Sequence, residues 1–267
     1  MERPIKSLQF AATDRAPGTE VVGFAEDAPK PRAPVDAGEV QYTQTRVLNV
    51  PPAALERNRV LAAHGQDPAS RAYKVLRTQV LQRLIAEDWQ TIAVVSPAAG
   101  EGKTLTAVNL AISLASTKSH TALLVDLDWL QPSVHTYFDF EPEHDVCDYL
   151  RGDKPLGAVL VNPGVPRFCF LPCARPVVDS SEQMLALAAF TRELKGRYRN
   201  RIVLFDLPPL LATDDALGFL PFVDCVLLVV EEGKTKRDDI ARCLDLIGPH
   251  RLVGTVMNKS RHRLPGY

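Results

Sequence analysis

SPAAGEGKT, residues 96–104, is the stretch that decides how this chain folds. An apolar run at residues 91–95 precedes it, and a helical pattern at residues 105–115 follows it. Strand, glycine loop and helix in this order are typical of a phosphate-binding loop, because Gly100 and Gly102 let the backbone turn its N–H groups inward. The start of the helix adds free N–H donors and the positive end of the helix dipole. The stretch therefore predicts a site for a nucleoside triphosphate.

Lys103 and Thr104 complete this loop. We expect Lys103 to reach the β- and γ-phosphates and the Thr104 hydroxyl to bind a magnesium ion. The strict pattern G-x-x-x-x-G-K-[ST] is not met, because Pro97 stands where its first glycine would be. The alternative is a glycine turn that only caps a helix, and the order of strand, loop, GKT and helix argues against it.

Composition places the chain among ordinary globular proteins, since 46% of its 267 residues are hydrophobic and 24% are charged. The net charge of -1 gives no electrostatic footprint for nucleic acid, so we expect no nucleic-acid partner. No apolar stretch approaches the ~18 residues needed to span a bilayer, and residues 1–10 lack an apolar signal core. These features predict a cytoplasmic protein.

The cysteines and histidines show no ligand pattern. The five cysteines form no C-x-x-C pair, and the six histidines lack metal-ligand spacing. We expect buried thiols in a reducing cytosol, with a redox or metal role as the alternative.

Three segments differ in composition. Residues 1–67 are rich in Pro, Ala and charged residues, which predicts a disordered N-terminal tail in which the apolar patch at 47–55 could be a docking segment. From residue 68 a helical apolar stripe begins, and the globular domain is expected to cover 68–260. Residues 261–267 are basic and short, and we expect a flexible C-terminal tail.

Apolar strands alternate with helical patterns along the domain. The runs at 121–125 and 201–205 end in carboxylates, Asp126 and Asp128 after the first and Asp206 after the second. Further apolar runs at 223–230 and 251–257 predict buried strands. The alternation predicts an α/β fold with a parallel sheet and helices on both faces, like that of P-loop NTPases. In such sheets ligands bind at the carboxyl ends of the strands.

Further polar residues follow these strands. Asp206 is the expected partner of the loop and the carboxylate that serves magnesium, whereas Asp214 and Asp215 begin a helix and either could be its N-cap. Asn258 could read the edge of a nucleotide base or could be a turn asparagine.

Together these motifs resemble the cytoplasmic tyrosine autokinases of bacterial capsule and exopolysaccharide export, the BY-kinases. The resemblance covers about residues 68–260 and rests on SPAAGEGKTLTAVNLA, LLVDLDWLQPSVH, IVLFDLPPLLATDDA and LVGTVMNKS. It implies ATP and Mg²⁺ as cofactors, catalytic residues Lys103, Asp126 and Asp128, and metal ligands Thr104, Asp126 and Asp206. The nucleotide-binding residues it implies are Ala99, Gly100, Glu101, Gly102, Lys103, Thr104, Leu105 and Asn258.

The resemblance also implies an activity and a partner. The γ-phosphoryl group of ATP would pass to tyrosines in the C-terminal tail of a neighbouring subunit, and Asp128 or Asp126 would accept the tyrosine proton. The partner would be a membrane-bound adaptor, a co-polymerase that sets polysaccharide chain length and recruits the kinase to the inner face of the plasma membrane. A homo-oligomer is expected, and Tyr267 is the candidate phosphoacceptor.

The chain departs from the family pattern at three places, although the family tolerates a residue other than glycine at Pro97. Leu130 stands where the family usually has an arginine after the second aspartate, and Arg71 and Lys74 replace residues of the N-terminal oligomerisation motif. A lysine cannot reproduce the bidentate fork of an arginine. Tyr267 is the one tyrosine in a tail where the family has a cluster.

Two alternatives therefore stay open. The first is an ATP-binding regulator of the same polysaccharide machinery that is catalytically weak or inactive. The second, less favoured, is a partitioning-type ATPase, whose loop would carry an additional lysine at the position of Ala98.

Overall fold

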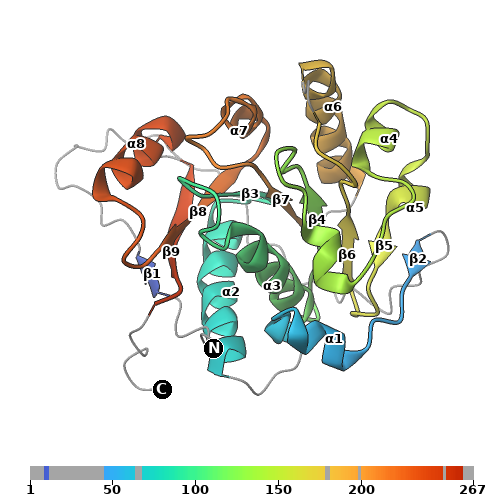
Figure 1. The fold of residues 1–267 in the computed structure, drawn as a ribbon, viewed down its shortest axis with the longest axis horizontal. Coiled ribbons are helices and arrows are strands. Elements are labelled where there is room, and N and C mark those ends of the chain that lie inside the picture. Colours follow the sequence, from blue (N-terminus) through green and yellow to red (C-terminus); the bar gives the residue numbers. More distant parts are fainter. Residues whose placement is uncertain are drawn as a thin grey trace, which may run out of the picture.

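The computed structural model describes residues 9–11, 45–63, 68–177, 181–197, 200–248 and 251–260. In this part of the chain a nine-stranded sheet runs through the middle of the molecule in the order β1-β9-β8-β3-β7-β4-β6-β5-β2 (Figure 1). Its strands are β1 (Gln9–Ala11), β2 (Arg46–Val47), β3 (Thr91–Val95), β4 (Thr121–Asp126), β5 (Val161–Asn162), β6 (Phe168–Leu171), β7 (Arg201–Asp206), β8 (Cys225–Glu231) and β9 (Leu252–Asn258).

The centre of the sheet is parallel. Strand β3 pairs in parallel with β7 and β8, β4 pairs in parallel with β7 and β6, and β8 pairs in parallel with β9. The antiparallel pairs, β1 with β9 and β5 with β6, lie toward the two edges. The predicted α/β fold is confirmed as a mostly parallel sheet, whereas the short strands β1, β2 and β5 were not predicted.

Helices cover both faces, as predicted, because the central strands are apolar on both sides. Ile92 and Val94 belong to a core shared with α2 and α3, whereas Ala93 and Val95 belong to a second core on the opposite face, with α6, α7 and α8. The α-helices are α1 (Pro52–Arg57), α2 (Pro68–Ala86), α3 (Lys103–Ala115), α4 (Val146–Leu150), α5 (Leu156–Val159), α6 (Ser181–Arg197), α7 (Asp215–Phe219) and α8 (Arg237–Ile247); the 3-10 helices are η1 (Leu61–Ala63), η2 (Val134–Phe138) and η3 (Leu220–Phe222).

Residues 45–63 correct the predicted N-terminal tail. This segment forms β2, α1 and η1, and its Leu55 and Val60 are buried in the core beside α2 and α3. Within these residues the expectation of disorder is wrong, because a few apolar side chains in a Pro- and Ala-rich segment are enough to anchor it. The rest of residues 1–44, apart from β1, and the tail 261–267 with Tyr267 lie outside the described residues.

None of the helices in the described part of the chain combines the length and hydrophobicity that crossing a bilayer requires.

Candidate active site

The loop between β3 and α3 has the backbone shape that its glycines predict. Gly100 and Gly102 have φ angles of 79° and 88°, in the left-handed region that suits glycine. A Cβ atom on Gly102 would lie 1.9 Å from Nδ2 of Asn258, so a larger residue would have to displace that side chain. The loop therefore requires glycine here both for its conformation and for the close approach of β9.

Polar side chains from the ends of β8 and β9 brace this loop. Glu101 accepts hydrogen bonds from the backbone N–H of Ala98 at 3.1 Å and from Oγ1 of Thr235 at 2.5 Å. Asn258 donates through Nδ2 to the carbonyl oxygen of Glu101 at 2.9 Å, and Lys259 donates through Nζ to that of Gly100 at 2.7 Å. Thr235 and Lys259 were not predicted as part of the site, although Lys259 directly follows β9 and Thr235 lies four residues after the end of β8.

Lys103, the first residue of α3, lies in a cluster of charges. Its Nζ is 2.6 Å from Oδ1 of Asp206, 3.1 Å from Oδ2 of Asp128 and 3.3 Å from Oγ1 of Thr104. Burial by itself would lower the pKa of Lys103, but the charges of Asp206 and Asp128 outweigh it and raise that pKa. The lysine is therefore a buried cation held by two carboxylates.

Thr104 and Asp206 meet at the carboxyl end of β7. The Thr104 hydroxyl donates to Oδ2 of Asp206 at 2.7 Å, and Asp206 is fully buried. Burial raises the pKa of Asp206, while Lys103 and Thr104 act against this rise. A hydroxyl and a carboxylate are the hard oxygen ligands that magnesium prefers, and the left-handed glycine loop beside them suits a phosphate chain. The residues present thus fit a magnesium-bound triphosphate.

Asp126 lies beside Asp206 because the two residues are paired in the register of β4 and β7. Its carboxylate accepts backbone N–H groups of Asp128 at 3.2 Å, Ser133 at 3.0 Å and Val134 at 2.9 Å. Burial raises its pKa well above the usual range, and the negative charge of Asp206 adds to this rise. In this structure Asp126 shapes the segment that leads from β4 into η2, and its role as metal ligand stays a prediction.

Asp128 follows on the same segment. Its Oδ1 accepts the backbone N–H of Gln131 at 3.1 Å, and its Oδ2 contacts Lys103. Leu130, the departure from the expected arginine, is 46% exposed and points its apolar side chain to the surface beside the site. The structure thus brings Lys103, Asp126, Asp128 and Asp206 to one edge of the sheet.

The other predicted nucleotide contacts lie on or under the loop. Ala99 and Gly100 are exposed, Leu105 is half-buried in the first turn of α3, and Glu101 and Asn258 are buried. Asn258 also accepts the backbone N–H of Lys259 at 2.8 Å, so both ends of its amide are bonded to the protein. Here it supports the loop, and its contact with a base stays a prediction.

Known proteins are similar to this sequence over most of its length. Tyrosine-protein kinase YwqD of Bacillus subtilis is 26% identical over 220 residues, which cover 80% of this chain and 92% of YwqD. Tyrosine-protein kinase CpsD of Streptococcus agalactiae is 24% identical over 200 residues, which cover 73% of this chain and 85% of CpsD. Over most of its length this chain is therefore similar to bacterial tyrosine-protein kinases. No protein-family model matches the sequence.

Solved structures share the fold of this chain. The chimerical protein CapA2B2 superposes with a TM-score of 0.70 at 22% identity, over 81% of this chain and 94% of that one. The kinase domain of the Escherichia coli tyrosine kinase ETK gives 0.69 at 21% identity, over 83% and 91%. The septum site-determining protein MinD of Pyrococcus horikoshii, solved with Mg-ADP, gives 0.50 at 22% identity, over 62% and 68%. These likenesses show the fold.

Proposed function

We propose that this chain is an ATP-dependent tyrosine-protein kinase of capsule or exopolysaccharide biosynthesis. The observation that carries the proposal is the meeting of four side chains at the carboxyl edge of the sheet. Nζ of Lys103 lies within 3.3 Å of Thr104, Asp128 and Asp206, and the Thr104 hydroxyl lies 2.7 Å from Asp206. The relatives named tyrosine-protein kinase support the activity. The succinoglycan biosynthesis transport protein ExoP of Rhizobium meliloti supports polysaccharide biosynthesis as the process; it is 28% identical over 186 residues, which cover 67% of this chain and 23% of ExoP.

In this proposal the protein contributes position and charge. The loop N–H groups and Lys103 would hold and neutralise the phosphates, and Thr104 with Asp206 would hold Mg²⁺, which supplies further positive charge to the phosphate oxygens. Since phosphoryl transfer asks for little covalent chemistry from the protein, placing the tyrosine hydroxyl in line with the γ-phosphate is the main task.

Asp128 is the better candidate for the group that accepts the tyrosine proton. Asp126 is completely buried and its carboxylate already accepts three backbone N–H groups, whereas Asp128 accepts one backbone N–H and contacts Lys103. When Lys103 turns to the phosphates, Oδ2 of Asp128 becomes available to an incoming hydroxyl. Asp126 then keeps the segment in place.

The partner and location follow from the same proposal. A membrane-bound adaptor that determines polysaccharide chain length would bind the kinase and hold it at the inner face of the plasma membrane. A neighbouring copy of the chain would present the phosphoacceptor tyrosine, with Tyr267 as the candidate on this sequence.

One observation favours a second candidate, an ATP-binding regulator of the same machinery that transfers no phosphate. The exposed Leu130 leaves the segment after Asp128 without the expected arginine, and residues 261–267 contain one tyrosine. Nucleotide occupancy would then be the signal that the adaptor reads.

One experiment separates the two candidates. The full chain is incubated with ATP and Mg²⁺, and phosphotyrosine is mapped by mass spectrometry in the wild type, in Lys103→Met and in Lys118→Met. Lys118 is exposed beyond the end of α3, so K118M is the matched control. We expect phosphotyrosine in the wild type and in K118M. In K103M the amount of phosphotyrosine should fall about 100-fold. ATP binding without any phosphotyrosine would support the regulator instead.

A further inference from the structure

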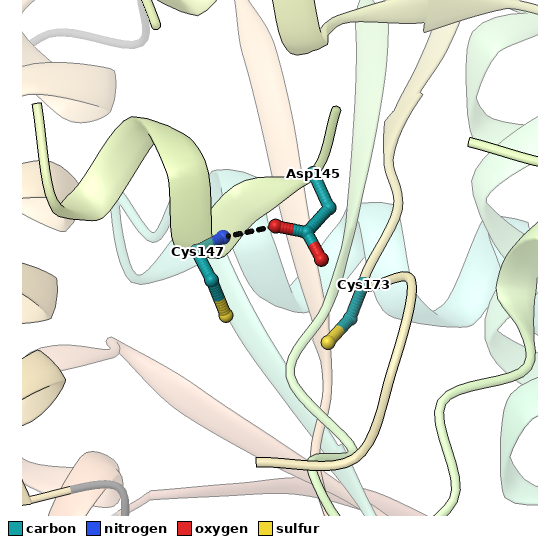
Figure 2. A group of neighbouring side chains, drawn as sticks. All are labelled: Asp145, Cys147 and Cys173. Carbon is teal, nitrogen blue, oxygen red and sulfur yellow. Dashed lines mark hydrogen bonds between the residues drawn. The ribbon is translucent and has the colours of Figure 1, made fainter. Parts of the chain in front are cut away.

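A second group of chemically active side chains lies away from the phosphate loop. Asp145, Cys147 and Cys173 each turn a potential ligand atom toward the others, and these atoms all lie within 4.8 Å of one another (Figure 2). Cys147 and Cys173 are far apart in sequence, so no C-x-x-C motif indicates that they lie close together. We call these three residues the thiol–carboxylate cluster. All five cysteines of the chain lie in described residues, and they are buried thiols as predicted.

The carboxylate of the cluster is fixed before any ligand arrives. Asp145 is the N-cap of α4: its Oδ1 accepts the backbone N–H groups of Cys147 at 2.9 Å and Asp148 at 3.1 Å. Its Oδ2 accepts the backbone N–H of Ala174 at 2.8 Å. Main-chain hydrogen bonds from both sides of the cluster therefore hold this carboxylate in one orientation, as outer partners do for the ligands of metal sites.

The spacing and chemistry of the cluster fit a small tetrahedral ion. With Zn–S and Zn–O bonds of roughly 2.3 and 2.1 Å, ligand atoms of a tetrahedral site lie about 3.5 to 3.8 Å apart. Because the ligand atoms lie within 4.8 Å of one another, each distance needs to shorten by at most about 1.3 Å to reach that geometry. The carboxylate is a hard ligand that zinc also accepts, and the two soft thiolates select zinc over magnesium or calcium.

We propose that Cys147, Cys173 and Asp145 bind one zinc ion. Both thiols would lose their protons to the solvent on binding, and Cys173 would give up the hydrogen bond that its Sγ donates to the carbonyl oxygen of Arg175 at 3.2 Å. Three protein ligands leave a fourth position for another donor.

His135 is the candidate donor for that fourth position, and its ring would have to move toward the cluster, because its nitrogens do not lie within 4.8 Å of all three ligand atoms. Its ring hydrogen-bonds to the main chain of Cys173, and the side chain is buried. Its Nδ1 has no hydrogen-bond partner among the described residues, which is unusual for a buried polar atom. A buried imidazole nitrogen without a partner, on a ring that is hydrogen-bonded to the main chain of Cys173, is a second sign that a ligand belongs near the cluster.

The place of the cluster in the fold gives the ion a structural role near the active site. Cys173 follows β6, whose Leu171 is paired with Val125 of β4, the residue before Asp126. Zinc would therefore fasten the start of α4 to the edge of the sheet on which the phosphate-site carboxylates stand. The proposal does not depend on kinase activity, and its tests use no ATP.

The first test uses the reduced, metal-free full chain. Cobalt(II) serves as the spectroscopic probe, and zinc then displaces it. We expect one cobalt per chain with a thiolate-to-cobalt charge-transfer band and tetrahedral d–d bands. In a second measurement the protein is alkylated in mild urea, and modified cysteines are identified by mass spectrometry. Zinc should protect Cys147 and Cys173 from alkylation, but not Cys243.

Variants assign the ligands. Cys147→Ser and Cys173→Ser should each weaken zinc binding at least 100-fold, and His135→Asn should weaken it about tenfold, in competition with a chelating indicator. Cys243→Ser removes another buried thiol, in α8, and should leave the affinity within twofold. Circular dichroism checks that each variant is folded.

Two results would overturn the proposal. One is wild-type protein that binds cobalt no better than C147S and shows no thiolate band. The other is a Cys147–Cys173 disulfide that forms on mild oxidation of a protein that binds no metal when reduced, which would make the pair a redox couple instead. The cobalt spectrum of the wild type tests the proposal by itself, even if one of the variants fails to fold.

Discussion

Gly102 shows how one residue carries two constraints. Its φ of 88° is left-handed, and its missing Cβ leaves room for Nδ2 of Asn258. Among the described residues, Gly152 offers a contrast, because its φ is 80° and nothing lies within 4 Å of the position of a Cβ there. Comparing the two glycines separates the cost of a left-handed backbone from the cost of displacing Asn258.

Gly102→Ala should destabilise the fold more than Gly152→Ala does. We expect about 1 kcal/mol for G152A from the left-handed backbone alone. We expect about 1 to 3 kcal/mol more for G102A, because Asn258 must leave its hydrogen bond with Glu101. Urea unfolding measures both. Similar losses in the two variants would show that the contact with Asn258 contributes nothing.

Asp206 should be the carboxylate on which magnesium depends. Asp206→Asn keeps the shape of the side chain but removes the charge beside Thr104, so we expect Mg²⁺-dependent ATP binding to weaken about 10- to 100-fold. Asp214→Asn changes an exposed residue at the start of α7 and should leave the affinity within twofold. Calorimetric titration with and without Mg²⁺ checks this, and equal losses would mean that the metal carboxylate is misassigned.

At the scale of elements, α1 is one of the parts that the sequence did not predict. Asn58, which follows it, donates through Nδ2 to the carbonyl oxygen of Tyr137 at 3.2 Å and to Oδ1 of Asp139 at 2.8 Å. Arg57 forms an ion pair with the same Asp139. The segment before residue 68 thus holds η2, the helix whose first N–H groups are bonded to Asp126.

Leu55→Ala should test whether α1 is part of the cooperative fold. Leu55 is 6% exposed in the core beside α2 and α3, so we expect a loss of about 2 to 4 kcal/mol in the free energy of unfolding. Val47→Ala, in β2, changes a side chain that is 56% exposed and should cost less than about 0.5 kcal/mol. A free energy of unfolding that is unchanged in L55A would show that α1 is not part of the cooperative fold.

The central elements could be predicted because local pattern and tertiary role agree in them. The runs that became β3, β4 and β7 are apolar throughout, and the glycine loop fixes its own position between strand and helix. Strand β5 and helix α1 could not be predicted, because two paired residues or two anchored side chains leave no periodic trace. Cys147 and Cys173 meet only through the fold, and Thr235 reaches Glu101 across 134 residues.

At the scale of the whole molecule, Asp224 ties the amino-terminal edge of the sheet together. It accepts hydrogen bonds from the backbone N–H groups of Gln90 and Thr91 at 2.8 and 2.9 Å, and Lys195 of α6 lies 2.5 Å from its Oδ1. Burial alone would raise its pKa, but the hydrogen bonds from Lys195, Gln90 and Thr91 outweigh this and lower it below 3.8. One carboxylate thereby links β3, β8 and α6.

Asp224 should make stability depend on acid pH. Because its pKa is lower in the folded than in the unfolded chain, its contribution is complete above pH 3.8 and is lost as the pH falls through the folded value. We expect the wild type to exceed Asp224→Asn in stability at pH 7, with the difference shrinking below about pH 4. Urea midpoints from pH 3 to 7 measure this. Asp245→Asn, an exposed change in α8, should show no such trend.

The contact between Asn258 and the glycine loop has a consequence for biosynthesis. The two partners are 157 residues apart, so a ribosome that adds about 5 to 20 residues per second makes the first on the order of ten seconds before the second. During that interval the nascent chain carries an SPAAGEGKT segment without its brace. If the loop holds nucleotide as proposed, that ability would belong to the finished domain, and translation that stops short of the last strand would yield a protein with an unbraced loop.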